Sequence, residues 1–247
     1  MGKTTICASL GTALAKLGAR VALVDADITL NNLDLTLGLE TSVVYDISDV
    51  VSGKCRLKQA LLQDPYAEGL FVLPSSHAMR SGGIAAKDFK EIILTLRENF
   101  DYVLIDCPAG VDEGFHRAVS ASSEALIVTT PSISALRDAD KVITLLDSYK
   151  MQNIALVVNR VRGDLVLEGE MLSVADIVKL LHIKIISCIP EDDKALMMCG
   201  STPALSLHNQ AIVMLAHNIE CGTARIFDAT AKYRGIVGKI RRKLIKI

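Results

Sequence analysis

Residues 21–27 read Val-Ala-Leu-Val-Asp-Ala-Asp, an apolar run that ends in two carboxylates. A run that is apolar at every position is typical of a parallel strand buried on both faces, since a half-exposed strand alternates. Residues 101–106, Asp-Tyr-Val-Leu-Ile-Asp, end a second strand in the same way. Ligands bind beyond the carboxyl ends of the strands in open parallel sheets. Asp25, Asp27 and Asp106 are therefore candidate ligand-binding residues, although a lone Asp at such a position more often caps the next helix.

Short β-branched runs and longer helical segments alternate along the whole chain. The runs are residues 20–24, 70–73, 102–105, 125–129, 154–158 and 185–189. The helical segments include residues 4–17, 86–98, 135–150 and 174–181. This order predicts an α/β fold with a doubly wound, mostly parallel sheet. Because no Pro/Gly-rich linker divides the chain, we expect one domain over residues 1–231 and an appended helix over residues 232–247.

The charge of the chain is unevenly distributed. The chain has 247 residues, half of them apolar, and a formal net charge of −1. Residues 232–247 carry seven basic and no acidic side chains, so this +7 leaves −8 for residues 1–231. An acidic body with a basic end predicts targeting to an anionic surface.

The cysteines and the lengths of the apolar runs indicate the cellular compartment of the protein. The six cysteines form no C-x-x-C pair and several lie in apolar runs, which favours free thiols in a reducing environment. No secretory signal opens the sequence, and no apolar run approaches the roughly 20 residues that span a bilayer. These features predict a cytoplasmic protein.

The first five residues, Met-Gly-Lys-Thr-Thr, run straight into a predicted helix and match the end of the phosphate-binding turn G-x-x-x-x-G-K-[ST]. At a helix N-terminus, Lys3 would reach the β- and γ-phosphates and the Thr4 hydroxyl would bind Mg²⁺. On its own, this match is equally well explained by chance. Two strands that end in Asp, at Asp25 and Asp106, favour a P-loop nucleotide site over chance. The strand that ends at Asp106 has the Walker B pattern, in which the Asp lies near the metal.

Several longer segments resemble one family closely. They are residues 25–35, 43–46, 53–61, 106–110, 137–140, 169–173 and 189–192. Residues 25–35 are similar to switch I of the MinD family of deviant Walker ATPases, and residues 106–110 to its switch II. ParA-type partition ATPases share the Walker elements, but they lack the Asn-Leu-Asp-Leu of residues 32–35 and the Val-Val-Tyr-Asp of residues 43–46. The resemblance covers essentially the whole chain and implies a P-loop ATPase fold.

The resemblance also implies a role for each matching residue. Lys3 would contact the phosphates in catalysis, and Asp27 would position the attacking water. Thr4 and, partly through water, Asp106 would hold Mg²⁺, the cofactor that accompanies ATP. The nucleotide-binding residues would be Gly2, Lys3, Thr4, Thr5, Asp25, Asn32, Asn159 and Pro190.

Within that set, four residues would do more than contact phosphate. Asp25 and Asn32 would belong to the nucleotide-sensing switch. Asn159 would recognise adenine, and the loop at Pro190 would close over the base. All four are implied by the resemblance and not by their spacing.

The beginning of the sequence departs from the family motif K-G-G-V-G-K-T-T. Its first lysine, which in the family reaches the partner's nucleotide, is absent, as are two glycines and the preceding central strand. A cation of this kind contributes roughly 10³–10⁵ in rate in related phosphoryl transfers. We therefore expect little or no ATPase activity from these 247 residues, and two strand edges without their central partner. A mis-assigned gene start, a fragment or a degenerate relative would each explain the difference.

The last sixteen residues have the pattern of a basic amphipathic helix. Apolar residues recur on one helical face at Tyr233, Ile236, Val237, Ile240, Leu244 and Ile247. Basic residues that fill the rest of the helix include Lys239, Arg241, Arg242 and Lys243. Such a helix predicts binding in the plane of an anionic membrane surface, where each basic residue contributes about 1 kcal/mol. The alternatives are a helix packed on the body with a solvated basic face, or a nucleic-acid patch, which the −8 body disfavours.

The resemblance implies an ATPase that places the division septum. It would form an ATP-dependent homodimer whose paired terminal helices attach to the inner face of the cell membrane. Its partners would be a MinC-type division inhibitor and a MinE-type or other topological regulator, with no specific nucleic acid. Two alternatives remain open, a ParA-like partitioning or flagellar-number ATPase, and an inactive, truncated membrane-binding scaffold.

Overall fold

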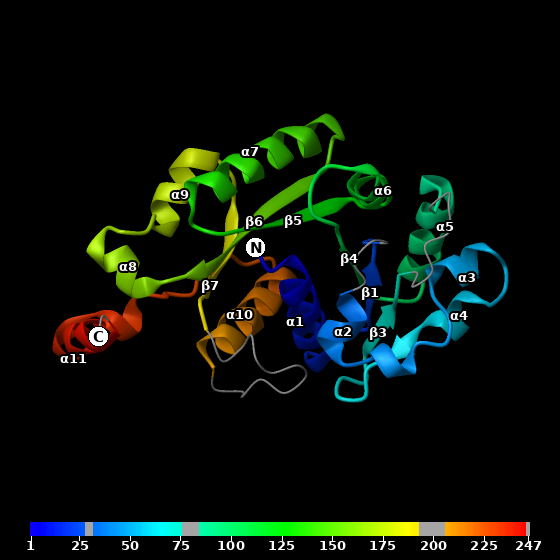
Figure 1. Ribbon diagram of the computed structural model, residues 1–247, viewed down its shortest axis with the longest axis horizontal. Coiled ribbons are helices and arrows are strands. Elements are labelled where there is room, and N and C mark those ends of the chain that lie inside the picture. The colour runs from blue at the N-terminus through cyan, green and yellow to red at the C-terminus, as the bar shows by residue number, and fades with distance from the viewer. Residues whose placement is uncertain (28–31, 76–83, 193–205, 246–247) are drawn as a thin grey trace. The chain divides into compact units, whose positions relative to one another are not determined.

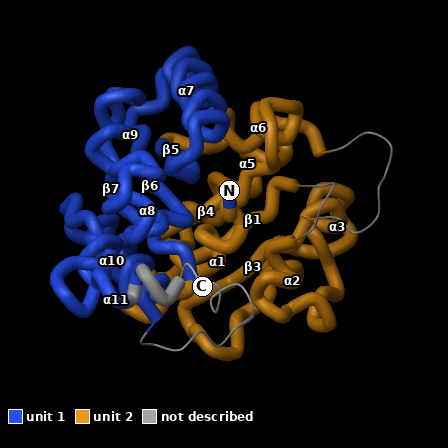
Figure 2. Tube along the Cα trace, turned by 60° about the vertical axis from the view of Figure 1, so that its left-hand side comes forward, with its two compact units in different colours: residues 1, 124–197, 202–247 blue, residues 2–123, 198–201 orange. Residues whose placement is uncertain are grey.

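The computed structural model describes residues 1–27, 32–75, 84–192 and 206–245. These residues fall into two compact units (Figure 2). Unit 1 consists of Met1, residues 124–192 and residues 206–245, and unit 2 consists of residues 2–123. Residues 232–245, predicted to be appended to a domain of residues 1–231, are part of unit 1. The predicted division itself stays a prediction.

Unit 2 contains a four-stranded sheet with the strand order β2-β3-β1-β4 (Figure 1). β3, β1 and β4 are parallel, and the short β2 is antiparallel. The strands are β1 (Val21–Asp25), β2 (Leu62–Gln63), β3 (Leu70–Leu73) and β4 (Tyr102–Asp106). The helices are α1 (Lys3–Lys16), α2 (Leu33–Leu37), η1 (Glu40–Ser42), α3 (Ile47–Val51), α4 (Leu57–Ala60), α5 (Ala86–Arg97) and α6 (Glu113–Ala121).

Unit 1 contains a three-stranded parallel sheet in the order β5-β6-β7. The strands are β5 (Glu124–Thr129), β6 (Asn153–Val161) and β7 (Ile185–Pro190). The helices are α7 (Ile133–Ser148), α8 (Gly163–Glu168), α9 (Val174–Leu181), α10 (Leu207–Cys221), η2 (Ala231–Tyr233) and α11 (Gly235–Ile245). The predicted α/β class with a mostly parallel sheet is confirmed, because β2 is the single antiparallel strand in the described residues.

Two apolar strands lie at the edges of these sheets. In the described residues, β4 pairs only with β1, and β5 pairs only with β6. Four of the five residues of β4 are half-buried and only the second half of β5 is buried, whereas every residue of β1 and β7 is buried. The prediction of two strand edges without their central partner stays a prediction.

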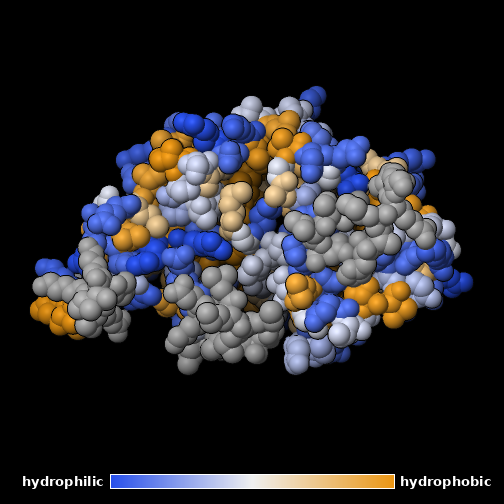
Figure 3. All heavy atoms as spheres, in the orientation of Figure 1, coloured by the Kyte–Doolittle hydropathy of each residue, from blue (hydrophilic) through white to orange (hydrophobic). Residues whose placement is uncertain are grey.

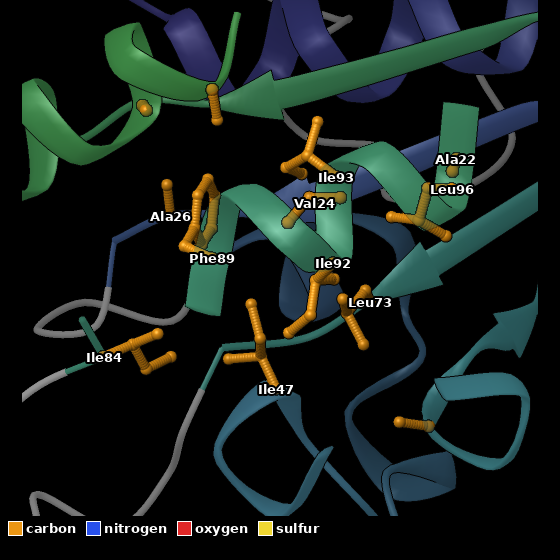
Figure 4. Close-up of a cluster of buried hydrophobic side chains, with 13 residues drawn as sticks. Ala22, Val24, Ala26, Ile47, Leu73, Ile84, Phe89, Ile92, Ile93 and Leu96 are labelled. Atoms are coloured by element: carbon orange, nitrogen blue, oxygen red, sulfur yellow. The ribbon is translucent and has the colours of Figure 1, made fainter. Parts of the chain in front are cut away.

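The core of unit 2 supports the strand that carries Asp25. α5 has buried residues at Phe89, Ile92, Ile93 and Leu96, the spacing of one helical face. In Figure 4 these side chains lie around Val24 of β1 and neighbours from the adjacent segments. The end of β1 therefore packs against a dense apolar core. This packing restricts the movement of the backbone that carries Asp25 and Asp27.

The end of α9 offers a simple test of backbone strain. Its C-cap, His182, is exposed and has φ 49°, a left-handed conformation that costs a residue other than glycine about 1–2 kcal/mol. Glycine removes this cost but adds about 0.5–1 kcal/mol of unfolded-state entropy. We expect His182→Gly to raise the free energy of unfolding by about 0.5–1 kcal/mol, measured by urea denaturation.

The matched control is Gly169→Ala at the end of α8, where φ is 75° and the strain would be introduced rather than removed. The control is expected to lower the denaturation midpoint. A His182→Gly midpoint at or below that of the unaltered chain would contradict the prediction.

Candidate functional site

The turn that begins α1 gathers the predicted phosphate-binding residues. Gly2 precedes the helix with φ 87° and ψ 30°, a left-handed conformation that glycine adopts without a steric penalty. In the described residues no side chain caps this end, and the first turn contains no acid. The first N–H groups of a helix have no partner within it, and with the helix dipole they attract an anion. Lys3, Thr4 and Thr5 follow Gly2 directly, so this turn of unit 2 suits a phosphate group.

Asp25 and Asp106 lie side by side at the carboxyl ends of β1 and β4. They are register partners in this parallel pair, and they are only 2% and 5% exposed. The N–H of Ala26 donates to the carbonyl oxygen of Asp106 at 3.0 Å, which extends the pairing past the end of β1. The sequence pattern placed both residues at strand ends, and the register brings them together.

Backbone donors hold the Asp25 carboxylate in place. Its Oδ1 accepts from the N–H of Asp27 at 2.9 Å, and its Oδ2 accepts from the N–H of Leu33 at 3.4 Å. Burial nevertheless raises the pKa of Asp25 to about 7, with a further rise from the charge of Asp106. The two N–H groups lower the pKa but do not offset burial. Near neutral pH, the ionised form of this carboxylate is therefore held at a free-energy cost.

Asp106 is tied to the start of α1. Burial raises its pKa, whereas a hydrogen bond with the Thr4 side chain and the charge of Lys3 lower it. The predicted pair of metal-binding residues, Thr4 and Asp106, is thus in direct contact, with the Lys3 ammonium nearby. Two buried carboxylates, a hydroxyl and a single lysine form an oxygen-rich site that favours a hard divalent cation.

Asp27 follows β1 and is partly buried. Its carbonyl oxygen accepts from the hydroxyl of Ser75 at 2.9 Å, and Ser75 is fully buried just after β3. Sequence reasoning missed Ser75, because no motif marks it. The contact spans 48 positions of the sequence and depends on the parallel pairing of β1 with β3.

The other predicted switch residue, Asn32, is exposed and forms the N-cap of α2. It precedes Leu33, whose N–H binds Asp25, so the start of α2 is linked to the end of β1. Residues 28–31 of the predicted switch I segment lie outside the described residues.

Asn159 and Pro190 belong to unit 1, whereas the other predicted nucleotide-binding residues belong to unit 2. Both are buried near the carboxyl end of the unit 1 sheet, where Pro190 pairs with Val161. The register between β6 and β7 shifts between Val158 and Val161, and Arg160 has φ 58°. Such bulges redirect side chains and are common beside functional sites. The Oδ1 of Asn159 accepts from the N–H of Arg160 at 2.9 Å, which fixes the amide within the bulge.

The terminal helix begins later than the sequence pattern predicted. α11 starts at Gly235, and Tyr233 lies in η2 and is only 7% exposed. The prediction that Tyr233 contributes to the apolar membrane face is therefore wrong, because its side chain is packed into unit 1.

The rest of the predicted face agrees with the helix as far as it is described. Ile236 is 81% exposed, and Val237 and Ile240 are more than half exposed, while Lys239 is also exposed. Figure 3 shows apolar atoms at the surface of α11. The structure describes no side chain of Arg241, Lys243 or Leu244, and Ile247 lies outside it; Arg242 is partly exposed. In the described residues no helix is long and apolar enough to cross a membrane.

Comparison with known proteins decides the family. Residues 1–198 match the CobQ/CobB/MinD/ParA nucleotide binding domain family. The septum site-determining protein MinD of Synechocystis is 39% identical over 251 residues, which cover 99% of this chain and 94% of the relative. The chain belongs to the MinD family of septum site-determining ATPases.

Solved structures of MinD proteins agree with this assignment and with the P-loop ATPase fold. The MinC:MinD cell division protein complex of Aquifex aeolicus includes a chain that is 41% identical, with a TM-score of 0.82 and coverage of 89% of this chain and 91% of that chain. MinD of Pyrococcus horikoshii, solved in complex with Mg-ADP, is 29% identical, with a TM-score of 0.78 and coverage of 89% and 90%. The MinD family likeness therefore extends from sequence to fold.

Proposed function

We propose that this chain binds ATP with Mg²⁺ and places the division septum by moving between the cytosol and the inner face of the cell membrane. The observation that carries the proposal is the hydrogen bond of Thr4, at the uncapped start of α1, with Asp106, whose register partner is the buried Asp25. This site favours an anion and a divalent cation at adjacent positions. The Mg-ADP complex of the P. horikoshii relative supports the same pair of ligands.

The described residues fit Mg-ATP as a ligand. The first-turn N–H groups and Lys3 would hold the phosphates, and Thr4 with Asp106 would hold Mg²⁺, partly through water. When bound, Mg²⁺ neutralises charge on the phosphates during phosphoryl transfer. Asp27, whose backbone is fixed by Ser75 and by Asp25, would orient the attacking water.

The proposed partners follow from the family and from the terminal helix. The Aquifex aeolicus MinC:MinD complex supports a MinC-type inhibitor as the partner of this chain. An ATP-dependent homodimer would present two copies of α11, and avidity would make membrane attachment depend on dimerisation. A MinE-type or other topological regulator would then act on the membrane-bound dimer.

Sedimentation with anionic vesicles tests the proposal directly. We expect several-fold more protein to bind phosphatidylglycerol-containing vesicles with Mg-ATP than with Mg-ADP, since ATP would pair the α11 helices. Lys3→Ala should remove this difference, because Lys3 is the cation beside the proposed phosphate site, and leave weak, nucleotide-independent binding. Fluorescence of a labelled ATP analogue would check that the variant has lost nucleotide affinity.

Two results would contradict the proposal in different ways. Equal binding with both nucleotides would support the alternative of a nucleotide-independent membrane scaffold. No binding under any condition, in a chain that still binds ATP, would reject the membrane part alone.

A further inference from the structure

The start of α6 lies where the segments that follow β1 and β4 meet. A Cβ added to Gly114 would lie 2.7 Å from the Cγ of Pro108, which follows β4, and 3.6 Å from the carbonyl oxygen of Ala26, which follows β1. The first distance is well below the roughly 3.5–4.0 Å at which two carbon atoms make contact. Gly114 is buried, so α6 packs against the Pro108 ring at a distance that only glycine permits.

The Pro108 ring lies two residues after Asp106, the proposed Mg²⁺ ligand. Proline has a fixed φ, and it restricts the backbone of the residue before it, here Cys107. The segment from Asp106 to Pro108 is therefore stiff. Its first residue is also held from β1, because the N–H of Ala26 donates to the carbonyl oxygen of Asp106 at 3.0 Å. A displacement of the Pro108 ring is therefore expected to reach Asp106.

The side of α6 that faces the core is anchored. Arg117 is buried one turn after the glycine, and its Nη1 donates to the carbonyl oxygen of Ile84 at 2.8 Å. Its guanidinium carbon lies 5.9 Å from the centroid of the Phe89 ring on α5. Ala118, the next residue of α6, belongs to the same buried cluster as Phe89. α6 is therefore not free to move away from a group that presses on its first turn.

The first turn of α6 is also fixed at its start. The Oδ1 of Asp112 accepts from the N–H of Gly114 at 3.1 Å and from the N–H of Phe115 at 3.3 Å. This is the N-cap arrangement that stabilises the first turn of a helix. The cap at Asp112 and the anchor at Arg117 hold the two ends of this turn, so it forms a fixed surface against which Pro108 rests.

We propose that Gly114 is a positioning residue for the Mg²⁺ site: it lets the Pro108 ring rest directly on α6, and this contact sets the place of the Asp106 carboxylate. The inference rests on the proposed function, in which Asp106 and Thr4 hold Mg²⁺ beside the nucleotide. Mg²⁺ requires a near-ideal arrangement of oxygen ligands, so a small displacement of one ligand weakens its binding. The contact between Gly114 and Pro108 is therefore expected to control metal affinity without touching the metal.

Gly114→Ala tests the inference because two effects of the added methyl group oppose each other. By helix propensity alone, alanine would stabilise α6 and leave metal binding unchanged. With the Pro108 ring in place, the methyl group overlaps it and one of the two must move. We expect the variant to need at least about tenfold more Mg²⁺ for half-maximal binding of a fluorescent ADP analogue. Its affinity for the same analogue in EDTA should change by less than about twofold, because the phosphate-binding start of α1 is not displaced.

A second substitution should restore metal binding. Pro108→Ala removes the Cγ with which the methyl group collides. The Mg²⁺ requirement of the double variant should therefore lie within about twofold of that of Pro108→Ala alone, a coupling that two independent sites would not show.

The matched control is Gly69→Ala, directly before β3. Its added Cβ would lie 2.5 Å from the carbonyl oxygen of Ala19, a collision of similar size at the amino end of the strand. Asp106 lies at the carboxyl end of the sheet. The control should lower the urea denaturation midpoint and leave the Mg²⁺ requirement unchanged.

Urea denaturation in EDTA measures the contact without metal or nucleotide. Gly114→Ala should lower the midpoint when Pro108 is present, because of the overlap. In the Pro108→Ala background the same substitution should raise the midpoint, because only the helix propensity of alanine remains. If Gly114→Ala alone did not fold, the inference would still require the double variant to fold and to bind Mg²⁺ as Pro108→Ala does.

The outcomes separate this inference from the proposed function. An unaltered chain that binds the ADP analogue no better with Mg²⁺ than in EDTA would reject the proposed function, and with it the metal role of Gly114. An unaltered chain that does depend on Mg²⁺, together with a Gly114→Ala variant that needs no more of it, would overturn the positioning role alone. Failure of Pro108→Ala to restore the Mg²⁺ requirement would overturn it as well.

Discussion

Asp25→Asn should raise the unfolding temperature of the nucleotide-free and metal-free protein at pH 8. The pKa of Asp25 is about 7 in the folded chain and 3.8 as the reference for the unfolded chain. Well below pH 3.8 the carboxyl is protonated in both states, so its pKa shift has no cost. Between pH 4 and pH 7 the folded state keeps a proton that the unfolded state has lost, so stability falls as pH rises, by on the order of 3–4 kcal/mol.

The amide introduced by Asp25→Asn would not ionise and would escape this penalty. It would lose the 3.4 Å contact with the N–H of Leu33, because an amide nitrogen does not accept a hydrogen bond. We therefore expect a net gain of about 2 kcal/mol at pH 8, or about 4–8 °C in unfolding temperature. At pH 4 most of the advantage should be lost, because Asp25 is then neutral in the folded state and only about half ionised in the unfolded state.

Calorimetry in EDTA from pH 4 to pH 8 would measure this difference. Asp147→Asn, at an exposed position of α7, is the matched control and should follow the unaltered chain across the range. If the unfolding temperatures of Asp25→Asn and the unaltered chain differed by the same amount at every pH, the prediction that burial raises the pKa of Asp25 would be wrong. Adding Mg²⁺ with ATP should reduce the difference in unfolding temperature between Asp25→Asn and the unaltered chain at pH 8. A bound cation stabilises the ionised carboxylates and binds only the folded state.

The double substitution Ile236→Asp with Ile240→Asp should weaken vesicle binding by more than about 100-fold. Each buried Ile contributes about 1.5–3 kcal/mol to association with an apolar phase, and each new acid loses about 1 kcal/mol against an anionic surface. At about 1.4 kcal/mol for each factor of ten, the combined loss exceeds two orders of magnitude. The fold should be unaffected, because both side chains are mostly exposed.

Sedimentation with phosphatidylglycerol vesicles and Mg-ATP would measure the loss. Leu180→Asp on α9 is the matched control, since Leu180 is 54% exposed, close to the 55% of Ile240, and receives the same charge. The control should bind as the unaltered chain does. Binding by the double variant within a few-fold of the control would show that α11 is not the lipid-binding element.

The strands and the chemistry at their ends could be predicted from local composition alone. Apolar runs without alternation predicted strands at residues 20–24 and 102–105, and the structure has β1 at Val21–Asp25 and β4 at Tyr102–Asp106. The prediction succeeds because a strand that is buried on both faces must be apolar at every position, and this property can be read from a few consecutive residues. The family resemblance, also a property of the sequence, implied ATP and Mg²⁺.

How these residues act on one another depends on contacts that form only in the folded chain. The pKa of Asp25 depends on the packing around β1 and on the register with Asp106, 81 positions away. The hydroxyl of Ser75 reaches Asp27 only because β3 lies beside β1. Neither contact has a local signal, since both arise from segments that meet only after folding.

In the terminal helix, too, some features could be predicted from the sequence and others depend on the tertiary structure. Periodicity correctly marked Ile236, Val237 and Ile240 as one face, because side-chain spacing along a helix is a local property. Periodicity assigned Tyr233 to that face as well, since its spacing also fits. The chain instead turns at Gly235, with φ 72°, and the Tyr233 side chain is buried in η2. Burial of this kind depends on tertiary packing, which no helical period encodes.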